Sequence, residues 1–182
     1  TSGNKYALAY SSDITVMLTN DFAPFLRPNQ YVNFTENSAV VKQAAVLVKD
    51  KKNDLEKITA VYNYVIKELT YDKEKAKTVR SGYIPDVDKV LASKKGICFD
   101  YASLMAAMLR SQGIPTKLVI GYAGNVYHAW IHTYIPEKGW IEGVIFFDGT
   151  TWKLMDPTYA SSSKQSKTIM EFIGNGSNSR SK

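Results

Sequence analysis

The sequence is organised around one stretch, Gly96-Ile97-Cys98-Phe99-Asp100-Tyr101-Ala102-Ser103-Leu104. This stretch contains the only cysteine among 182 residues, and the cysteine stands where an apolar, helix-forming segment begins. The segment continues to about Leu109, and Gly113 and Pro115 mark its end. We therefore predict a helix that carries Cys98 in its first turn.

A thiol in the first turn of a helix lies at the positive end of the helix dipole, beside N–H groups without helical partners. Both features favour the thiolate, which is the nucleophilic form of cysteine. The alternative for a lone cysteine is an inert side chain that packs as a small hydrophobe. The remainder of the chain is needed to choose between these two interpretations.

Composition indicates an ordinary globular protein, with 45% hydrophobic and 22% charged residues. We expect one domain over residues 1–182, because this length suffices for a sizeable core. One cysteine excludes an intramolecular disulfide, and no apolar run approaches the roughly 20 residues of a membrane span. The chain begins at Thr1, which fits a cleaved signal peptide as well as a cloning boundary.

The formal net charge of +6 does not arise from a dense basic cluster. No block of five or more lysines and arginines occurs, so we expect no nucleic-acid partner. Weak attraction to an anionic cell surface is the one charge-driven association that we expect.

The first 35 residues show no regular pattern apart from a short β-like run, Ile14–Leu18. Aromatic side chains are scattered through this segment, at Phe22, Phe25, Tyr31 and Phe34. We predict that residues 1–35 form a strap across the core, anchored by these rings. An aromatic-lined binding groove is the alternative interpretation.

Helical periodicity dominates the first half of the chain. It predicts helices over residues 38–50, capped by Asn37, and over residues 53–69, with a shorter helix after Pro85 that ends near Gly96. The lysine- and glutamate-rich residues 73–80 are expected to form an exposed excursion.

Strand patterns dominate the second half. β-branched and aromatic residues predict strands over residues 117–122, 126–135, 140–147 and 151–155. Asp148-Gly149 is a hairpin signal, and residues 174–182 are expected to be a frayed tail. Helices followed by strands indicate an α+β fold, in which helices pack on an antiparallel sheet.

Two histidines, His128 and His132, are the only candidates for a histidine base. On a strand they lie about 13 Å apart, at ~3.3 Å per residue, which is too far for both to bind one zinc ion. We therefore expect no metal site. Both would point to one face of the strand, so periodicity alone does not choose between them.

Two aspartates could orient the histidine: Asp156 at a strand end and Asp148 in a turn. The turn itself explains Asp148 more simply.

Several short motifs in fixed order resemble the transglutaminase-like superfamily. The resemblance covers about Tyr71 to Thr158, which we take as a catalytic core of residues 71–158. The matching pieces are Gly96-Ile-Cys98-Phe-Asp100-Tyr-Ala-Ser-Leu, Leu109-Arg-Ser-Gln-Gly113-Ile-Pro115, Gly121-Tyr122, His128-Ala-Trp130, Gly139-Trp140 and Asp156-Pro-Thr158.

The resemblance implies a papain-like fold with Cys98 on a helix that faces His128 and Asp156 on a sheet. His128, and not His132, stands at the family's His-Ala-Trp position. Cys98 would be the nucleophile, His128 its base and Asp156 the residue that orients the histidine. The backbone N–H of Cys98 would be one oxyanion donor, with Tyr83 or Tyr71 as candidates for the second.

Further side chains are expected to surround this site. Asp100 is expected to satisfy backbone N–H groups at the helix start and to take no part in the chemistry. Tyr83, Tyr122, Trp130 and Trp140 are candidate walls of a substrate cleft.

The implied activity is acyl transfer through a thioester on a protein or peptide substrate, without a cofactor. A thiol hydrolase, either protease or amidase, is favoured slightly over an amine-accepting transglutaminase, and no calcium-loop pattern occurs. The alternative is a non-catalytic binding or scaffold module. We expect a secreted or cell-surface monomer of bacterial type.

A Cys–His–Asp triad also constrains the order of the strands. The strand with His128 must lie directly beside the strand that ends at Asp156, since two strand spacings amount to nearly 10 Å and exceed any hydrogen bond. We therefore expect residues 136–149 to leave this hairpin as a separate ribbon.

Overall fold

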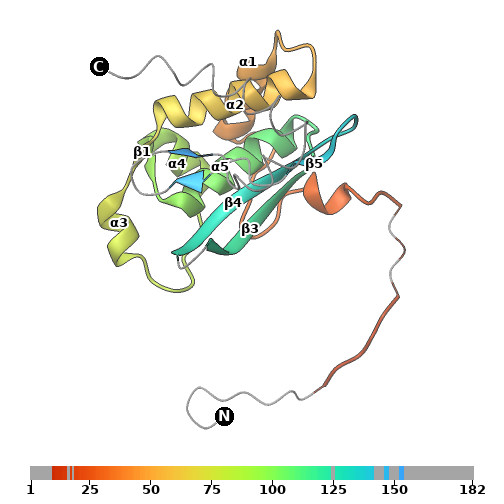
Figure 1. Ribbon diagram of the computed structural model, residues 1–182, viewed down its shortest axis with the longest axis horizontal. Coiled ribbons are helices and arrows are strands. Elements are labelled where there is room, and N and C mark those ends of the chain that lie inside the picture. Colours follow the sequence, from red (N-terminus) through yellow and green to blue (C-terminus); the bar gives the residue numbers. More distant parts are fainter. Residues whose placement is uncertain are drawn as a thin grey trace.

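The computed structural model describes residues 10–15, 17, 19–123, 126–141, 146–147 and 152–153. Helices pack together on one side of an antiparallel sheet (Figure 1). Along the chain the elements are η1 (Ala23–Phe25), α1 (Ala39–Val48), α2 (Asp54–Glu68), β1 (Thr70–Tyr71), α3 (Lys73–Thr78), α4 (Val87–Ser93), β2 (Lys95–Gly96), α5 (Cys98–Ser111), β3 (Thr116–Ala123), β4 (Val126–Ile135), β5 (Gly139–Ile141), β6 (Phe146–Phe147) and β7 (Trp152–Lys153). The α+β architecture expected from the sequence is confirmed.

Helix α5 is the centre of the molecule. It lies between α1, α2 and α4 on one side and strands β3 and β4 on the other (Figure 1). Because it is covered on all sides, its side chains from Asp100 to Arg110 are all buried, including Leu104, Met105 and Met108. This explains why the segment is almost uniformly apolar in sequence.

The main sheet consists of the β3–β4 hairpin and a short third strand, β5. Strands β3 and β4 pair antiparallel from Thr116↔Thr133 to Ala123↔Val126, and β5 then pairs with the far end of β4. Alternate residues of β4, namely Ala129, Ile131 and Ile135, belong to the buried core. The pattern of period two therefore places one face of β4 against α5.

The expected helices are present, but the start of α1 differs from the prediction. Helix α2 begins where the sequence indicates, and Asn53 caps it by accepting a hydrogen bond from the Glu56 N–H at 2.9 Å. Helix α1 begins after Ser38, not Asn37, and no side chain of its own caps it. Its N–H groups at Ala39 and Val40 donate instead to the Asp88 carboxylate of α4, at 3.2 and 2.9 Å.

Residues 73–80, which we expected to form an exposed excursion, contain helix α3. Asp72 starts this helix by accepting a hydrogen bond from the Lys75 N–H at 2.9 Å. No residue of α3 is buried, so the expected exposure is confirmed, while the helix itself was not predicted. The helix forms because the cap satisfies its first turn, a feature that the charged composition conceals.

A two-residue parallel ladder joins β1 to β2 immediately before the cysteine. The Thr70 N–H donates to the Lys94 carbonyl and the Asp72 N–H to the Gly96 carbonyl, each at 2.8 Å. Tyr71 is therefore paired with Gly96, two residues before Cys98. Strands this short carry no periodic signal, so the sequence does not predict this contact.

Of the strap expected over residues 1–35, the described aromatic residues near η1 pack on the body of the protein. Phe22 packs on Tyr134 with ring centroids 4.3 Å apart, and Phe25 packs edge-on against Trp140 at 5.1 Å. The buried Arg110 side chain donates to the Arg27 carbonyl at 2.8 Å, which ties this segment to α5. The β-like run Ile14–Leu18 forms no strand at its described positions, and this part extends away from the body (Figure 1).

The strand order after β4 differs from the expectation. Of residues 140–147, those that the structure describes belong to two different pairings: β5 pairs with Thr133–Ile135 of β4, and β6 pairs with β7. Among the described residues β7 pairs with β6, and it is β6 that approaches β4. The expected direct pairing of β4 with β7 is therefore not found in this part of the chain.

Asp156 and the expected tail at 174–182 lie outside the described residues, so the position of Asp156 beside His128 stays a prediction.

The hairpin signal at Asp148-Gly149 agrees with the strand pairing around it. Strands β6 and β7 pair antiparallel on either side of residues 148–151, as a ribbon of their own.

None of the helices in the described ranges has the length and the apolar composition that a membrane span requires.

The contact between Asp88 and α1 can be tested by mutation. Replacing Asp88 with Ala should lower the free energy of unfolding by about 0.5–2 kcal/mol, because two N–H groups of α1 lose their acceptor. Urea unfolding measures the change. Glu74→Ala is the control, since it removes an exposed ion pair with Lys77 and should cost less than about 0.5 kcal/mol. An equal loss in both variants would contradict this account.

Candidate active site

A cleft of about 640 Å³ opens at the first turn of α5. The start of α5, the first residues of β4 and the loop over residues 79–84 form its walls. Cys98 and His128, predicted as nucleophile and base, both line this cleft. The structure therefore brings together two residues that are 30 positions apart in sequence.

Cys98 is the first residue of α5, as the sequence predicts. Its half-buried thiol is approached by the backbone N–H groups of Ala129 on β4 and of Phe99 in its own helix. Burial raises the pKa of the thiol above its ordinary value, and these N–H groups oppose the rise only in part. The depressed pKa that we expected is therefore wrong for this arrangement, since desolvation outweighs the helix N-terminus.

His128 lies near the start of β4, opposite Gly121 of β3. Its side chain is 8% exposed, and burial lowers its pKa below the ordinary value of 6.5. The imidazole is therefore neutral at pH 7 and able to accept a proton. Together with the raised thiol pKa, this indicates a resting pair of neutral thiol and neutral imidazole.

Tyr71 lies directly beside Cys98. The backbone N–H of Cys98 interacts with its hydroxyl oxygen, and burial is the main cause that raises the pKa of the phenol. The hydroxyl therefore keeps its proton at neutral pH. Of the two candidates for a second oxyanion donor, Tyr71 is the one placed next to the Cys98 N–H.

Tyr83 lines the cleft, but its proton is directed elsewhere. The Tyr83 hydroxyl donates to the Asp100 carboxylate at 2.5 Å and accepts a hydrogen bond from Lys75 Nζ at 2.6 Å. This geometry disfavours Tyr83 as an oxyanion donor and favours it as part of the cleft wall.

Asp100 caps the start of α5. Its carboxylate accepts a hydrogen bond from the Ile97 N–H at 2.8 Å, which agrees with the expected structural role. Gly96 is required for this fold-back, because a Cβ atom at that position would lie only 2.6 Å from the Cβ of Asp100. The glycine of the Gly-Ile-Cys motif thus makes room for the cap.

The other predicted cleft residues lie elsewhere in the structure. Tyr122 is 73% exposed and packs against Tyr127, Trp130 donates to the Nε2 atom of His132 at 2.8 Å, and Trp140 packs under the strap. None of these three lines the cleft as described. The motifs do not show which face of a strand borders the cleft, because the other walls of the cleft come from distant parts of the chain.

The sequence analysis did not assign most of the cleft residues to the site. Tyr127 and Ile120 belong to strands predicted correctly but were not assigned to the site, and Tyr31 comes from the strap. Tyr31 packs on Phe99 with centroids 5.9 Å apart, so the alternative of an aromatic groove holds for this one ring.

The described residues contain no group of three or more His, Cys, Asp or Glu side chains that could bind a metal. His132, the second histidine, accepts its hydrogen bond from Trp130. The third predicted catalytic residue, Asp156, lies outside the described residues and stays a prediction.

The protonation state of Cys98 can be measured by alkylation with iodoacetamide. Because burial raises the thiol pKa, the rate in the native protein should rise with pH around a midpoint above the 9.0 of an ordinary thiol. His132→Gln, which alters the other histidine, should leave the curve unchanged. A midpoint well below 8 would show a thiolate–imidazolium pair and contradict the neutral pair.

Comparison with known sequences agrees with this geometry. A sequence model of the transglutaminase-like superfamily matches residues 42–143, which is more than half of the chain. The uncharacterized protein YebA of Bacillus subtilis is 32% identical over 118 residues, covering 54% of this chain and 16% of YebA. A protein-glutamine gamma-glutamyltransferase of Pseudomonas aeruginosa is 34% identical over 86 residues, covering 40% of this chain and 11% of that enzyme. The chain thus matches less than a fifth of the length of these relatives.

Solved structures share the fold. A protein of Cytophaga hutchinsonii, provisionally assigned as a cysteine protease, superposes with a TM-score of 0.55 at 25% identity, covering 68% of this chain and 41% of that one. The periplasmic domain of TgpA from Pseudomonas aeruginosa gives a TM-score of 0.50 at 22% identity, covering 78% and 50%. With the family match and the motif order in agreement, the chain belongs to the transglutaminase-like superfamily.

Proposed function

We propose that this chain is a cysteine-dependent acyl-transfer enzyme that acts on peptide or side-chain amide bonds of polypeptides. The observation that carries this proposal is the shared cleft, in which Cys98 at a helix start and His128 on β4 line one cavity. The superfamily includes proteases and transglutaminases, and both activities begin with the same attack by a thiol on an amide carbonyl.

The reaction would proceed in two halves. The sulfur of Cys98 attacks the carbonyl carbon, and the thiol proton passes to His128. The C–N bond then breaks, and His128 gives that proton to the leaving amine. In the second half a water molecule or an amine attacks the thioester, loses a proton to His128 and releases the acyl product, and the thiol recovers the proton.

Charge that develops on the carbonyl oxygen requires donors that are already in place. The backbone N–H of Cys98 and the hydroxyl of Tyr71 lie next to each other at the thiol and are suited to this role. Asp156 would hold His128 in the correct tautomer and support its positive charge.

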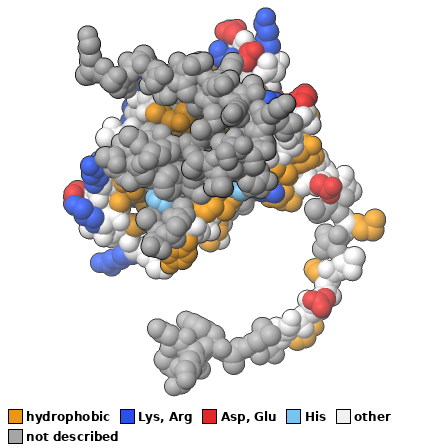
Figure 2. All heavy atoms as spheres, viewed as in Figure 1, with side chains coloured by type: hydrophobic (Ala, Val, Ile, Leu, Met, Phe, Trp, Pro, Cys, Tyr) orange, Lys and Arg blue, Asp and Glu red, His pale blue; other side chains and the backbone are white. Residues whose placement is uncertain are grey.

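Water is favoured over an amine as the acceptor. A lysine acceptor is cationic before it reacts and would enter most readily beside a carboxylate. No acidic residue lines the cleft in the described ranges, whereas Arg80 does. Figure 2 shows basic side chains gathered on the side of the molecule that carries α3. We therefore propose a thiol hydrolase in preference to a cross-linking enzyme.

The cleft also suggests a substrate with apolar side chains near the scissile bond. Exposed large apolar side chains are concentrated there: Tyr31, Val79, Ile84, Ile120 and Tyr127. Exposed apolar groups in one cleft indicate a binding surface. We propose an extracytoplasmic location, for which the periplasmic domain of TgpA is the structural parallel.

A product assay tests the proposal. Peptides with apolar residues around glutamine are incubated with the protein, with and without dansylcadaverine, and ammonia, new amino termini and incorporated amine are quantified by mass spectrometry. We expect hydrolysis products in excess over incorporated amine. Dominant amine incorporation would instead show a transglutaminase.

Two matched variants identify the residues responsible. Cys98→Ala should reduce turnover by about 10⁴-fold or more with little change in melting temperature, and His128→Ala should do the same. His132→Ala, on the same strand, should retain activity. Unchanged turnover in Cys98→Ala would contradict Cys98 as the nucleophile, whereas no turnover in the wild type would favour a binding or scaffold module.

A further inference from the structure

We propose that Lys75 and Tyr83 are positioning residues for the Cys98 nucleophile and act on it through the buried carboxylate of Asp100. This inference rests on the proposed function, in which Cys98 attacks the substrate. The sequence pattern around Lys75 assigns this residue no role, and the motif around Cys98 does not include it.

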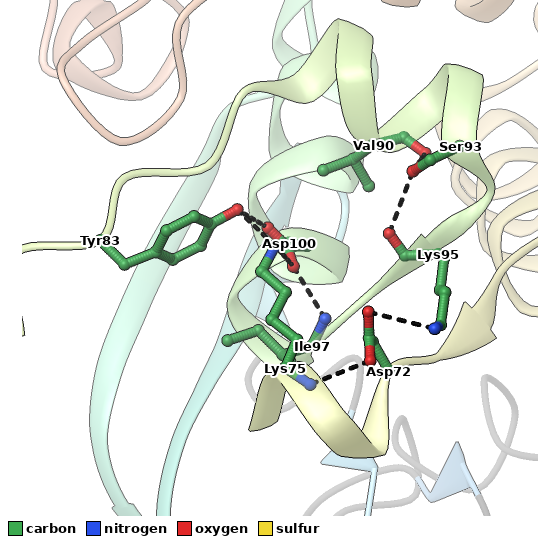
Figure 3. Close-up of polar contacts among 8 residues, drawn as sticks. All are labelled: Asp72, Lys75, Tyr83, Val90, Ser93, Lys95, Ile97 and Asp100. Carbon is green, nitrogen blue, oxygen red and sulfur yellow. Dashed lines mark hydrogen bonds and ion pairs between the residues drawn. The ribbon is translucent and has the colours of Figure 1, made fainter. Parts of the chain in front are cut away.

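Three donors converge on Asp100, whose side chain is 0% exposed (Figure 3). Lys75 Nζ donates to Oδ2 at 2.7 Å, the Ile97 N–H donates to the same oxygen at 2.8 Å, and the Tyr83 hydroxyl donates to Oδ1. A buried carboxylate requires such compensation, because desolvation of a lone charge is very unfavourable. Lys75 is thus the counter-charge of a carboxylate two residues from the nucleophile.

The network joins three separate segments at the site. Lys75 comes from α3, Tyr83 from the loop that forms one wall of the cleft, and Asp100 from the first turn of α5. Lys75 Nζ also lies 4.2 Å from the centre of the Tyr83 ring, and that ring meets Phe99 edge-on at 6.3 Å. The cleft wall is therefore fixed directly to the turn that carries the thiol.

Charge adds a second effect to this mechanical one. Asp100 is a negative group close to Cys98 and contributes to raising the pKa of the thiol. The ammonium of Lys75 offsets that charge, and its bonds to Asp100 and Tyr83 outweigh the burial that would lower its own pKa. Lys75 therefore stays charged at neutral pH and makes loss of the thiol proton easier.

Other ionisable groups around the thiol do not replace Lys75. Tyr71 keeps its proton, because burial raises its pKa, and His128 is neutral at pH 7, because burial lowers its pKa. Arg80 and Tyr127 also line the cleft, but no hydrogen bond or ion pair to Asp100 is found for either among the described contacts. Lys75 is the cation that contacts the Asp100 carboxylate in the described structure.

The test is the rate at which iodoacetamide alkylates Cys98 in the folded protein at pH 8. Lys75→Met should lower this rate about five- to tenfold, because the thiol pKa rises when the compensating charge is removed. Lys75→Arg should restore most of the rate. Lys95→Met is the matched control: Lys95 pairs with Asp72 at 3.4 Å in the neighbouring cluster, and its loss should leave the rate unchanged (Figure 3).

A second pair of variants guards against loss of folding in Lys75→Met. Tyr83→Phe keeps the ion pair and removes the two hydrogen bonds of the Tyr83 hydroxyl, to Asp100 and from Lys75. It should stay folded and react about two- to threefold more slowly. In an Asp100→Asn background, Lys75→Met should have a much smaller effect, since the two residues act together. Melting temperatures confirm that each variant is folded.

The alkylation readout does not require turnover, so it separates this inference from the proposed function. Equal alkylation rates in wild type, Lys75→Met and Tyr83→Phe would overturn the inference, even if the melting temperature falls. A reduced rate in Lys75→Met that Lys75→Arg restores supports it, even if no acyl-transfer substrate is found.

Discussion

The site depends on how the first turn of a buried helix is held. Helix α5 is buried from Asp100 to Arg110, and Ile97 before it is buried as well, so the Ile97 N–H needs a partner within the protein. Asp100 folds back to the Ile97 N–H, and Gly96 leaves the space for it. The same turn carries Cys98, and the β1–β2 ladder and β4 are built against it. The contacts that cap the start of α5 therefore also fix the position of Cys98.

Burial gives the site its chemical character. The thiol and the imidazole are both withdrawn from water, which favours the neutral form of each. Under the proposed function, this pair would react by passing a proton from Cys98 to His128 as the sulfur attacks, so that the charges form only when the substrate is bound. Beside it, Lys75 forms an ion pair with the buried Asp100 carboxylate, and we propose that this pair acts on the thiol.

The sequence was sufficient for the elements with a strong local signal. Strand β4, helix α2 and the position of Cys98 at the start of α5 follow from periodicity and from helix-boundary residues. The resemblance of the motifs selected His128 over His132. The contact from Lys75 to Asp100, 25 positions apart, has no local signature. Two-residue strands such as β1 have no local signature either. Tertiary packing also decides that Tyr127, and not Tyr122, lines the cleft.

The central claim is that Cys98 and His128 act as nucleophile and base in one cleft. Rapid acid quench of the protein with a p-nitrophenyl ester of a short apolar peptide, followed by peptide mapping, tests it directly. The account predicts an acyl group on Cys98 that forms at least about 100-fold more slowly in His128→Ala and at the normal rate in His132→Ala. Acylation at another residue, or equal rates in both histidine variants, would contradict it.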